Sequence, residues 1–470
     1  MDSTTQQRDA VPRDVDPQRL LYSLMFPAII MPLSGWMFSV SLPIMRDDFG
    51  ITADLAAWIA TAFTLSFMIC MPIYGRLSDS LGKRRLLLGG ITIFTLGSIL
   101  ATISLNLPML IIARVIQGLG VAGLLPLSLA LITEVFPPNE RGKAMGLWST
   151  IGPVTGVAGP ILAGFIVAAW GWRASFIPAT IFAIASLLVI YFLIPSSIRQ
   201  LRFDFLRRFD WLGVILLSAT LIFLLFYFSS RPITGIAPLQ DWRLLALTIF
   251  FLTAFVWHEQ RREEPFIRLQ ILRNRSLVVG SLAAMLRMIG LSGGMGFLMP
   301  LYLADVVQLD PSRSGFFLMA NPLAMVAVVR LGGSIADRWG SRLIAMTGFT
   351  VYSGVMFAFS QRTAASPQWL VIGLLFCFGL GAGLMLAALH RAALDNIPDA
   401  DLGTSSGIYS MIRFLGSACG AAFGGILLQA NLDRYNTDFL PAYQTVFLWF
   451  MGFAALGFLT AFFLPKSKSA

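Results

Sequence analysis

The sequence predicts an all-α protein that crosses a membrane about fourteen times. Of its 470 residues, 57% are hydrophobic and only 12% are charged, which is about half the charged fraction that a soluble protein carries. The mean hydropathy is +0.76. The apolar residues fall in runs of about twenty, the length that a helix needs to cross about 30 Å of hydrocarbon. Only short connections separate these runs.

Fourteen apolar segments follow one another along the chain, between a polar tail over 1–19 and a short tail over 465–470. We expect spanning helices over 20–42, 56–75, 86–104, 108–133, 145–169, 173–194, 212–229, 243–258, 277–303, 314–334, 343–360, 368–390, 405–429 and 443–464.

The distribution of Lys and Arg predicts the orientation, because cytoplasmic loops carry an excess of basic residues. With the N-terminus in the cytoplasm, the inside segments hold 23 of the 34 basic residues and the outside loops hold seven. We therefore expect a multi-pass protein of the inner (plasma) membrane with both termini in the cytoplasm. The net charge of +10 is spread through short loops, so a nucleic-acid partner is not expected.

A ten-residue pattern occurs twice. The sequence from Gly75 to Arg84 follows the second segment, and the sequence from Gly333 to Arg342 follows the tenth, with the same spacing of glycine, aspartate and glycine. Internal repeats of this kind are typical of transporters whose halves rock about a central site. We therefore expect two six-helix bundles, 20–194 and 277–464, joined by a linker over 195–276 that carries two extra spanning helices.

These residues resemble the major facilitator superfamily, and fourteen helices resemble its drug:proton antiporter branch. The resemblance covers almost the whole chain. It rests on the repeated loop and on four further stretches, which are Arg114-Val-Ile-Gln117-Gly118-Leu-Gly120, Gly152-Pro153-Val-Thr-Gly156-Val-Ala-Gly159-Pro160, Asp210-Trp-Leu-Gly213 and Arg413-Phe-Leu-Gly416. It implies the major facilitator fold and secondary active transport.

The resemblance also implies roles for particular residues. Arg114 is the expected arginine of the helix 4 motif. Gly152, Pro153, Gly156, Gly159 and Pro160 are similar to the helix 5 motif typical of antiporters. The alternative reading of this stretch is ordinary close packing, because small residues let helices approach one another.

The repeated loop has a physical interpretation of its own. Asp79 and Asp337 each stand at a helix end near basic residues, Arg84 among them. A carboxylate in such a place can stabilise the positive N-terminus of a helix in the opposite half. By repeat symmetry we expect Asp79 near residues 403–405 and Asp337 near the fifth helix, as two cytoplasmic latches. The glycines that permit the two turns are Gly75, Gly82, Gly333 and Gly340. The alternative is a basic turn that only sets the topology.

Arginines inside the apolar segments are further candidates, because charges in hydrocarbon are costly and commonly mark a transport pathway. Arg114 has Gln117 one turn along its helix. Arg287 lies ten residues into its segment, about 15 Å deep. A substrate or gating role for Arg287 competes with that of a structural arginine bonded to backbone carbonyls. Arg413 lies about two turns into the thirteenth segment.

The first segment departs from the family pattern. Fourteen-helix antiporters carry an aspartate in a stretch resembling Leu-Asp-x-Thr-Ile-Val-Asn-Val-Ala-Leu-Pro, and here Ser34 stands in its place, two residues before Trp36. No Asp or Glu lies well inside any of the fourteen segments, and Asp54, Glu134 and Asp305 stand at segment ends. Proton coupling needs a group that titrates between the two faces. The proton therefore remains only a candidate coupling ion.

We predict a secondary transporter that exports amphipathic or lipophilic small molecules by alternating access, as multidrug efflux proteins do. One alternative is an exporter of an anionic metabolite or lipid that is driven by membrane potential, and another is a non-transporting sensor or scaffold. The candidates for substrate binding or coupling are Ser34, Trp36, Arg114, Gln117, Arg287 and Arg413. We expect a monomer in the lipid bilayer with no cofactor, no metal and no enzymatic activity.

Overall fold

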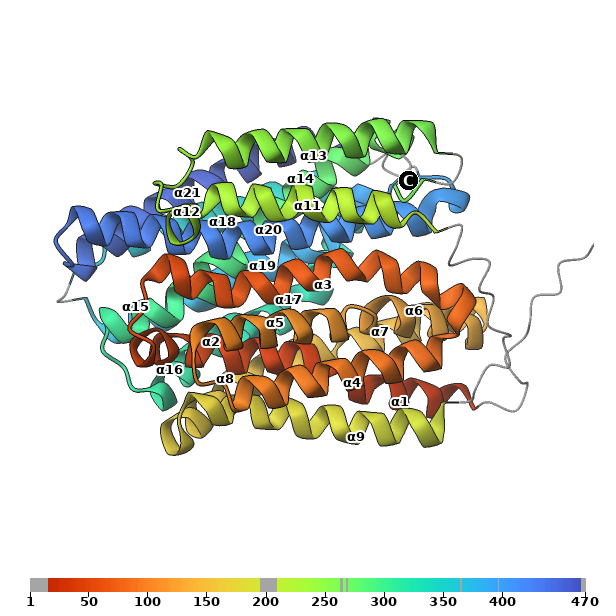
Figure 1. Ribbon diagram of the computed structural model, residues 1–470, viewed down its shortest axis with the longest axis horizontal. Coiled ribbons are helices and arrows are strands. Elements are labelled where there is room, and N and C mark those ends of the chain that lie inside the picture. Colours follow the sequence, from red (N-terminus) through yellow and green to blue (C-terminus); the bar gives the residue numbers. More distant parts are fainter. Residues whose placement is uncertain are drawn as a thin grey trace, which may run out of the picture.

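The computed structural model describes residues 16–194, 209–262, 265–267, 269–363, 366–395 and 397–465. The described chain is built from helices that run roughly side by side (Figure 1). Thirteen of its helical segments are long and apolar enough to cross a membrane. The expected fourteenth is α13 (Trp242–Arg261), which is 20 residues long, as is α4 (Lys83–Thr102), and carries polar groups near its ends.

Two groups of helices form the two halves of the molecule, with a helical hairpin between them in the sequence. The N-terminal half contains α1 (Pro17–Ala28), α2 (Ile30–Asp48), α3 (Ala53–Leu81), α4, α5 (Leu107–Val121), α6 (Leu124–Val135), α7 (Pro138–Ser149), α8 (Ile151–Trp170), the 3-10 turn Trp172–Phe176 and α9 (Ile177–Leu193). The linker hairpin contains α11 (Trp211–Phe228), the short α12 (Arg231–Thr234) and α13. The C-terminal half follows the 3-10 turn Leu269–Arg273 and contains α14 (Arg275–Met288), the π-helix Ile289–Leu298, α15 (Met299–Asp305), α16 (Pro311–Leu318), α17 (Ala320–Trp339), α18 (Ser341–Ser360), α19 (Gln368–Leu394), α20 (Asp399–Arg434) and α21 (Phe439–Phe462).

Several spans are interrupted, and proline accounts for the positions of the breaks. A proline has no N–H to donate to the carbonyl four residues earlier. Three helices end four residues before a proline. They are α1, which ends at Ala28 before Pro32, α7, which ends at Ser149 before Pro153, and α16, which ends at Leu318 before Pro322. In each case a single residue separates the two helices, which resume at Ile30, Ile151 and Ala320, so each pair still forms one kinked span.

The repeated loop folds alike in both halves. Gly82 separates α3 from α4 with φ +82° and ψ +136°, and Gly340 separates α17 from α18 with φ +86° and ψ +146°. Residues with a side chain rarely adopt this region of backbone conformation. The two glycines therefore explain the sharp reversal after each repeat. Gly75 lies within α3, and a side chain there would meet nothing within 4 Å.

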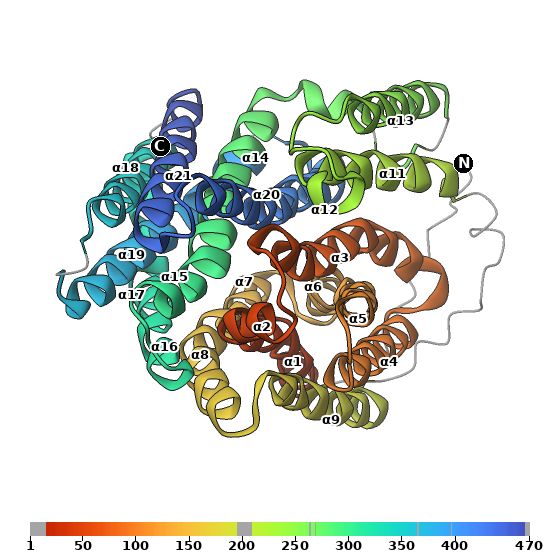
Figure 2. The same ribbon diagram turned by 60° about the vertical axis from the view of Figure 1, so that its left-hand side comes forward.

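The two halves meet along paired helices. The helix α3 packs along α20, and α8 packs against both α16 and α17. The linker hairpin lies outside this contact, beside α3 and α20 (Figure 2). We call the end of the bundle that carries the α2–α3 turn the Asp305 end, on the left of Figure 1, and the opposite end the Gly82 end.

Candidate functional site

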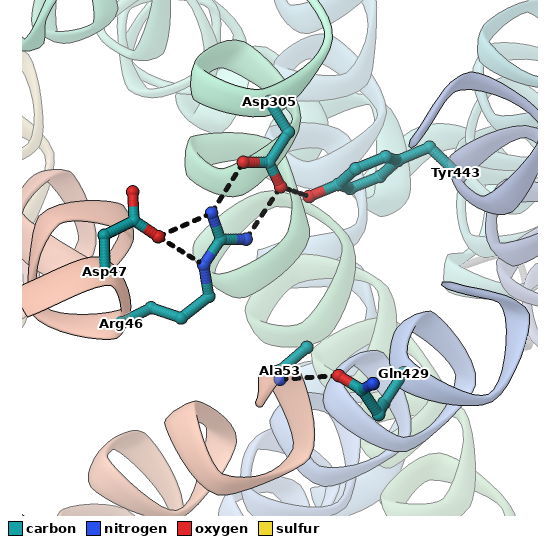
Figure 3. A network of polar contacts seen from close by, with 6 residues as sticks. All are labelled: Arg46, Asp47, Ala53, Asp305, Gln429 and Tyr443. Carbon is teal, nitrogen blue, oxygen red and sulfur yellow. Dashed lines mark hydrogen bonds and ion pairs between the residues drawn. The ribbon is translucent and has the colours of Figure 1, made fainter. Parts of the chain in front are cut away.

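A buried ion pair joins the two halves at the Asp305 end (Figure 3). The guanidinium of Arg46, in the last turn of α2, donates two hydrogen bonds to the carboxylate of Asp305, which ends α15, each over 2.7 Å. The Tyr443 hydroxyl of α21 donates a third to the same carboxylate, also over 2.7 Å. Asp47 lies 2.9 Å from the guanidinium on its open side. We call these four residues the Asp305 network.

Burial makes the Asp305 network energetically sensitive. The side chains of Arg46 and Asp305 are only 12% and 6% exposed. Removing one partner from a buried pair costs about 3–5 kcal/mol, because the other charge is left without compensation. Bidentate pairing of arginine with a carboxylate also fixes the relative orientation of the two groups. The contact is therefore suited to hold the halves together in one arrangement.

Two further hydrogen bonds connect the halves near the same end. The Ser39 hydroxyl of α2 donates to the Gly296 carbonyl over 2.6 Å. Pro300, four residues further along the chain, has no N–H to donate to this carbonyl. The Ser39 hydroxyl therefore supplies a hydrogen bond that the helix itself cannot. The Ala53 N–H, at the start of α3, donates to Gln429 Oε1 of α20 over 3.0 Å (Figure 3). A first-turn N–H has no partner inside its own helix, so this bond satisfies it.

The glycines of α8 allow this helix to pack closely against α2, α16 and α17. A Cβ at Gly164 would lie 2.5 Å from the Pro311 carbonyl oxygen in the C-terminal half, and one at Gly159 would lie 2.9 Å from Trp36. A Cβ at Gly156 would lie 2.9 Å from Pro322. The same test at Gly152 finds nothing within 4 Å. A Cβ at Gly315, in α16, would lie 2.3 Å from the carbonyl oxygen of Pro160 in α8.

The residues proposed for the latches are described in part. Asp79 and Asp337 belong to α3 and α17, but their side chains, like Gly333, lie outside the residues whose surroundings are described. The predicted latches therefore stay a prediction. The Arg84 guanidinium donates to the Tyr191 carbonyl and lies 5.4 Å from the centre of that ring. Arg84 thus joins α4 to α9 inside the N-terminal half.

Arg114 is held by a network within the N-terminal half. Its guanidinium donates to Gln117 Oε1 over 2.8 Å and to the Ile59 carbonyl over 3.2 Å. It also lies 4.5 Å and 4.4 Å from the ring centres of Phe38 and Phe63. The Gln117 amide in turn donates to Ser98 Oγ over 2.9 Å. This arrangement satisfies the charge without a carboxylate, through carbonyls and aromatic faces.

The other two arginines lie in the C-terminal half. Arg287 is 3% exposed and donates twice to the Ala382 carbonyl, over 3.0 Å and 3.3 Å. The Arg413 guanidinium lies 4.6 Å from the ring centre of Phe414 and 6.0 Å from that of Tyr409. Arg413 Nε is buried with no hydrogen-bond partner among the described residues. Within the described residues, neither Arg287 nor Arg413 forms an ion pair with a carboxylate.

Ser34 and Trp36 occupy different environments in α2. Ser34 is 2% exposed, and its hydroxyl has no partner among the described residues. Trp36 lies against Gly156 and Gly159 of α8 and is half-buried.

The sequence places Asp305 at a segment end but singles out neither Arg46 nor Tyr443 as a site residue. No local signal could have paired them, because Arg46 and Asp305 are 259 positions apart.

Comparison with known proteins gives consistent matches over this fold. A family model described as Major Facilitator Superfamily matches residues 24–360 and 277–470. The riboflavin transporter RibZ of Clostridioides difficile is 30% identical over 413 residues, covering 87% of each chain. A multidrug resistance protein B homolog of Mycobacterium tuberculosis is 29% identical, over 89% of this chain and 78% of its own length. A bacterial homolog of the human lysosomal transporter Spinster, solved in an inward-facing and unoccupied conformation, has a TM-score of 0.69 at 12% identity, covering 97% of this chain and 98% of its own.

Proposed function

Because the chain belongs to the major facilitator superfamily, we propose that it exports amphipathic or lipophilic small molecules by alternating access. The observation that carries alternating access is the Asp305 network, in which a buried ion pair joins α2 of one half to α15 of the other at the Asp305 end. Rocking of the halves separates Arg46 from Asp305 and opens that end. Re-formation of the pair closes it again.

We place the Asp305 end outside the cell, which follows from the excess of basic residues on the loops of the other end. A single cysteine at Ile236, between α12 and α13, is then expected to react with a membrane-impermeant reagent added to intact cells. A single cysteine at the exposed Glu140 of α7 is expected to react only after the membrane is permeabilised. The background is a variant in which Cys70, Cys377 and Cys419 are replaced. The reverse labelling pattern would invert the orientation.

The names of two relatives support the substrate class. One is described as a riboflavin transporter and the other as a multidrug resistance protein homolog. Riboflavin is a planar amphipathic molecule, and multidrug substrates are commonly lipophilic. These properties suit a helical bundle in which a few polar groups orient a mostly apolar ligand.

A second candidate is export of compounds that carry an anionic group. Arg287 and Arg413 bring two positive charges into the C-terminal half without a carboxylate partner in the described chain. An anionic group on the substrate would compensate Arg413, whose Nε has no hydrogen-bond partner among the described residues. Outward movement of an anion is favoured by an inside-negative potential by about 2.3 kcal/mol per charge at 100 mV.

Arg413→Gln is therefore expected to reduce transport of an anionic dye about tenfold or more, because a hydrogen bond to a charged group contributes about 1.5–3 kcal/mol. Transport of a cationic dye is expected to fall much less. The measurement is dye movement in proteoliposomes with the potential clamped by potassium and valinomycin. The matched control is Arg434→Gln, at the exposed end of the same helix α20.

Equal loss for both dyes would contradict the anionic preference and leave the general export proposal standing. Failure of the wild-type protein to move either dye, or a panel of other amphipathic compounds, would instead favour a sensor or scaffold on the same fold.

A further inference from the structure

Two buried carboxyl groups meet where the linker hairpin ends at the Gly82 end. Asp210 caps α11, and its Oδ1 accepts the Gly213 N–H over 3.0 Å and lies 2.7 Å from His258 Nε2. Glu259, in the last turn of α13, accepts the Ile267 N–H with Oε2 over 3.0 Å. Asp210 is 3% exposed and Glu259 is 4% exposed. Each carboxyl group thus has one oxygen in a defined hydrogen bond.

The remaining oxygens of the two groups face the same point. Asp210 Oδ2 and Glu259 Oε1 are both buried, and neither has a hydrogen-bond partner among the described residues. Each lies 2.5 Å from the position that a Cβ would take at Gly213, so they are at most twice that distance apart. Two carboxylates buried this closely repel each other, and one of them retains a proton.

We propose that Asp210 and Glu259 bind one proton between them, and that this proton fastens the linker hairpin to the N-terminal half. The proposal concerns a site outside the two six-helix bundles. It depends neither on the substrate nor on the direction of transport.

The connection to the N-terminal half runs through a short segment after α13. Glu259 holds the Ile267 N–H of this segment, and Arg76 of α3 donates to the Pro265 and Phe266 carbonyls over 2.9 Å and 3.1 Å. Phe266 and Ile267 are 5% and 8% exposed. The same residues therefore contact the carboxyl pair on one side and the repeated loop of α3 on the other. Loss of the proton places two negative charges side by side, and their repulsion drives the ends of α11 and α13 apart. The Ile267 N–H bonds more strongly to the ionised Glu259, so the 265–267 segment moves with α13 and is drawn away from Arg76.

Three basic groups lie around the carboxyl pair, and the charge of His258 favours the ionised form of both carboxyl groups. His258 acts on both carboxyl groups, Arg76 faces the 265–267 segment, and the Arg261 guanidinium lies 4.1 Å from the Trp257 ring centre. Glu259 stands one residue beyond the segment 243–258 that is expected to span the membrane. Burial, and then the neighbouring Asp210, raise the pKa of Glu259 to about 7. Burial acts to raise the pKa of Asp210 as well, but hydrogen bonds from His258 and the Gly213 N–H lower it overall.

The sign of the pH dependence follows from the raised pKa of Glu259. The proton is bound at acid pH, where the hairpin is held, and it is lost as the pH rises through about 7. Spin labels at the exposed positions Gln260 and Arg85 are expected to show a short, narrow distance distribution at acid pH. The distribution is expected to lengthen and broaden with a midpoint near pH 7. The infrared band of a protonated carboxyl group is expected to disappear over the same interval.

Glu259→Gln mimics the protonated form and is expected to abolish both changes, leaving the hairpin attached at every pH. Asp210→Asn removes the neighbouring negative charge, so the midpoint is expected to fall by about one pH unit or more. Asparagine caps a helix about as well as aspartate, which keeps this variant informative if Glu259→Gln does not accumulate. The matched control is Glu140→Gln, the same chemical change at an exposed position of α7.

A wild-type protein without the carboxyl band at acid pH would overturn the proposal. So would persistence of the band and its titration in Glu259→Gln, or an unchanged midpoint in Asp210→Asn. A matching loss in Glu140→Gln would assign the signal to another carboxyl group and would also contradict the proposal.

Discussion

Replacing Asp305 with asparagine is expected to reduce transport by at least about tenfold while leaving insertion and folding of the two halves intact. The substitution leaves the Arg46 guanidinium, 12% exposed, without its bidentate partner at the closed end. Loss of one member of such a pair costs about 3–5 kcal/mol. This shifts the equilibrium away from closure of that end by about two orders of magnitude or more. Initial rates of transport in proteoliposomes measure the effect.

The chain offers a matched control for this substitution. Arg231 and Asp433 also form an ion pair at the Asp305 end, but their side chains are 49% and 43% exposed. Exposed pairs contribute about 0–1 kcal/mol. Asp433→Asn is therefore expected to keep most of the wild-type rate. Equal rates in the Asp305→Asn and Asp433→Asn variants would show that the buried pair does not control closure.

Gly164→Ala is expected to abolish or nearly abolish transport, because the added methyl group has no room when the Asp305 end is closed. It would lie 2.5 Å from the Pro311 carbonyl oxygen and 3.0 Å from Ser312 Cα. Both are backbone atoms, so a change of rotamer cannot relieve the overlap. Closure would require α8 and α16 to move apart. The rate of transport and the thermal stability of the purified protein together report the effect.

Gly152→Ala is the control for that change, since a Cβ at Gly152 meets nothing within 4 Å. Alanine also favours a helix over glycine by about 1 kcal/mol, so a small gain in stability is expected there. If Gly164→Ala transports at the rate of Gly152→Ala, the contact between α8 and α16 is not needed for the transport cycle.

Much of the fold could be predicted from the sequence because membrane spans depend on local composition. The apolar runs, the repeated loop and the positive φ at Gly82 and Gly340 all follow from residues close together in the chain. The breaks after Ala28, Ser149 and Leu318 are likewise fixed by prolines four residues later. Signals of this kind need no knowledge of tertiary contacts.

The contacts between the halves could not be predicted in this way. Arg46 looks like an ordinary basic residue at a helix end, and its partner Asp305 becomes apparent only when α2 and α15 lie together. Glu259 stood just beyond a predicted span, and only its approach to Asp210 across Gly213 makes it unusual. For Arg287 the sequence left two readings open. Its hydrogen bonds to the Ala382 carbonyl fit the structural one and do not test a role in substrate binding.

The most direct test of alternating closure is a distance measurement at both ends of the bundle. Spin labels at the exposed positions Thr52 and Gln308 report on the Asp305 end, and labels at Glu140 and Leu402 report on the Gly82 end. Substrate and Asp305→Asn are each expected to lengthen the first distance and to shorten the second. If the two distances change in the same direction, or if Asp305→Asn leaves the first unchanged, the Asp305 network does not close one end of an alternating-access transporter.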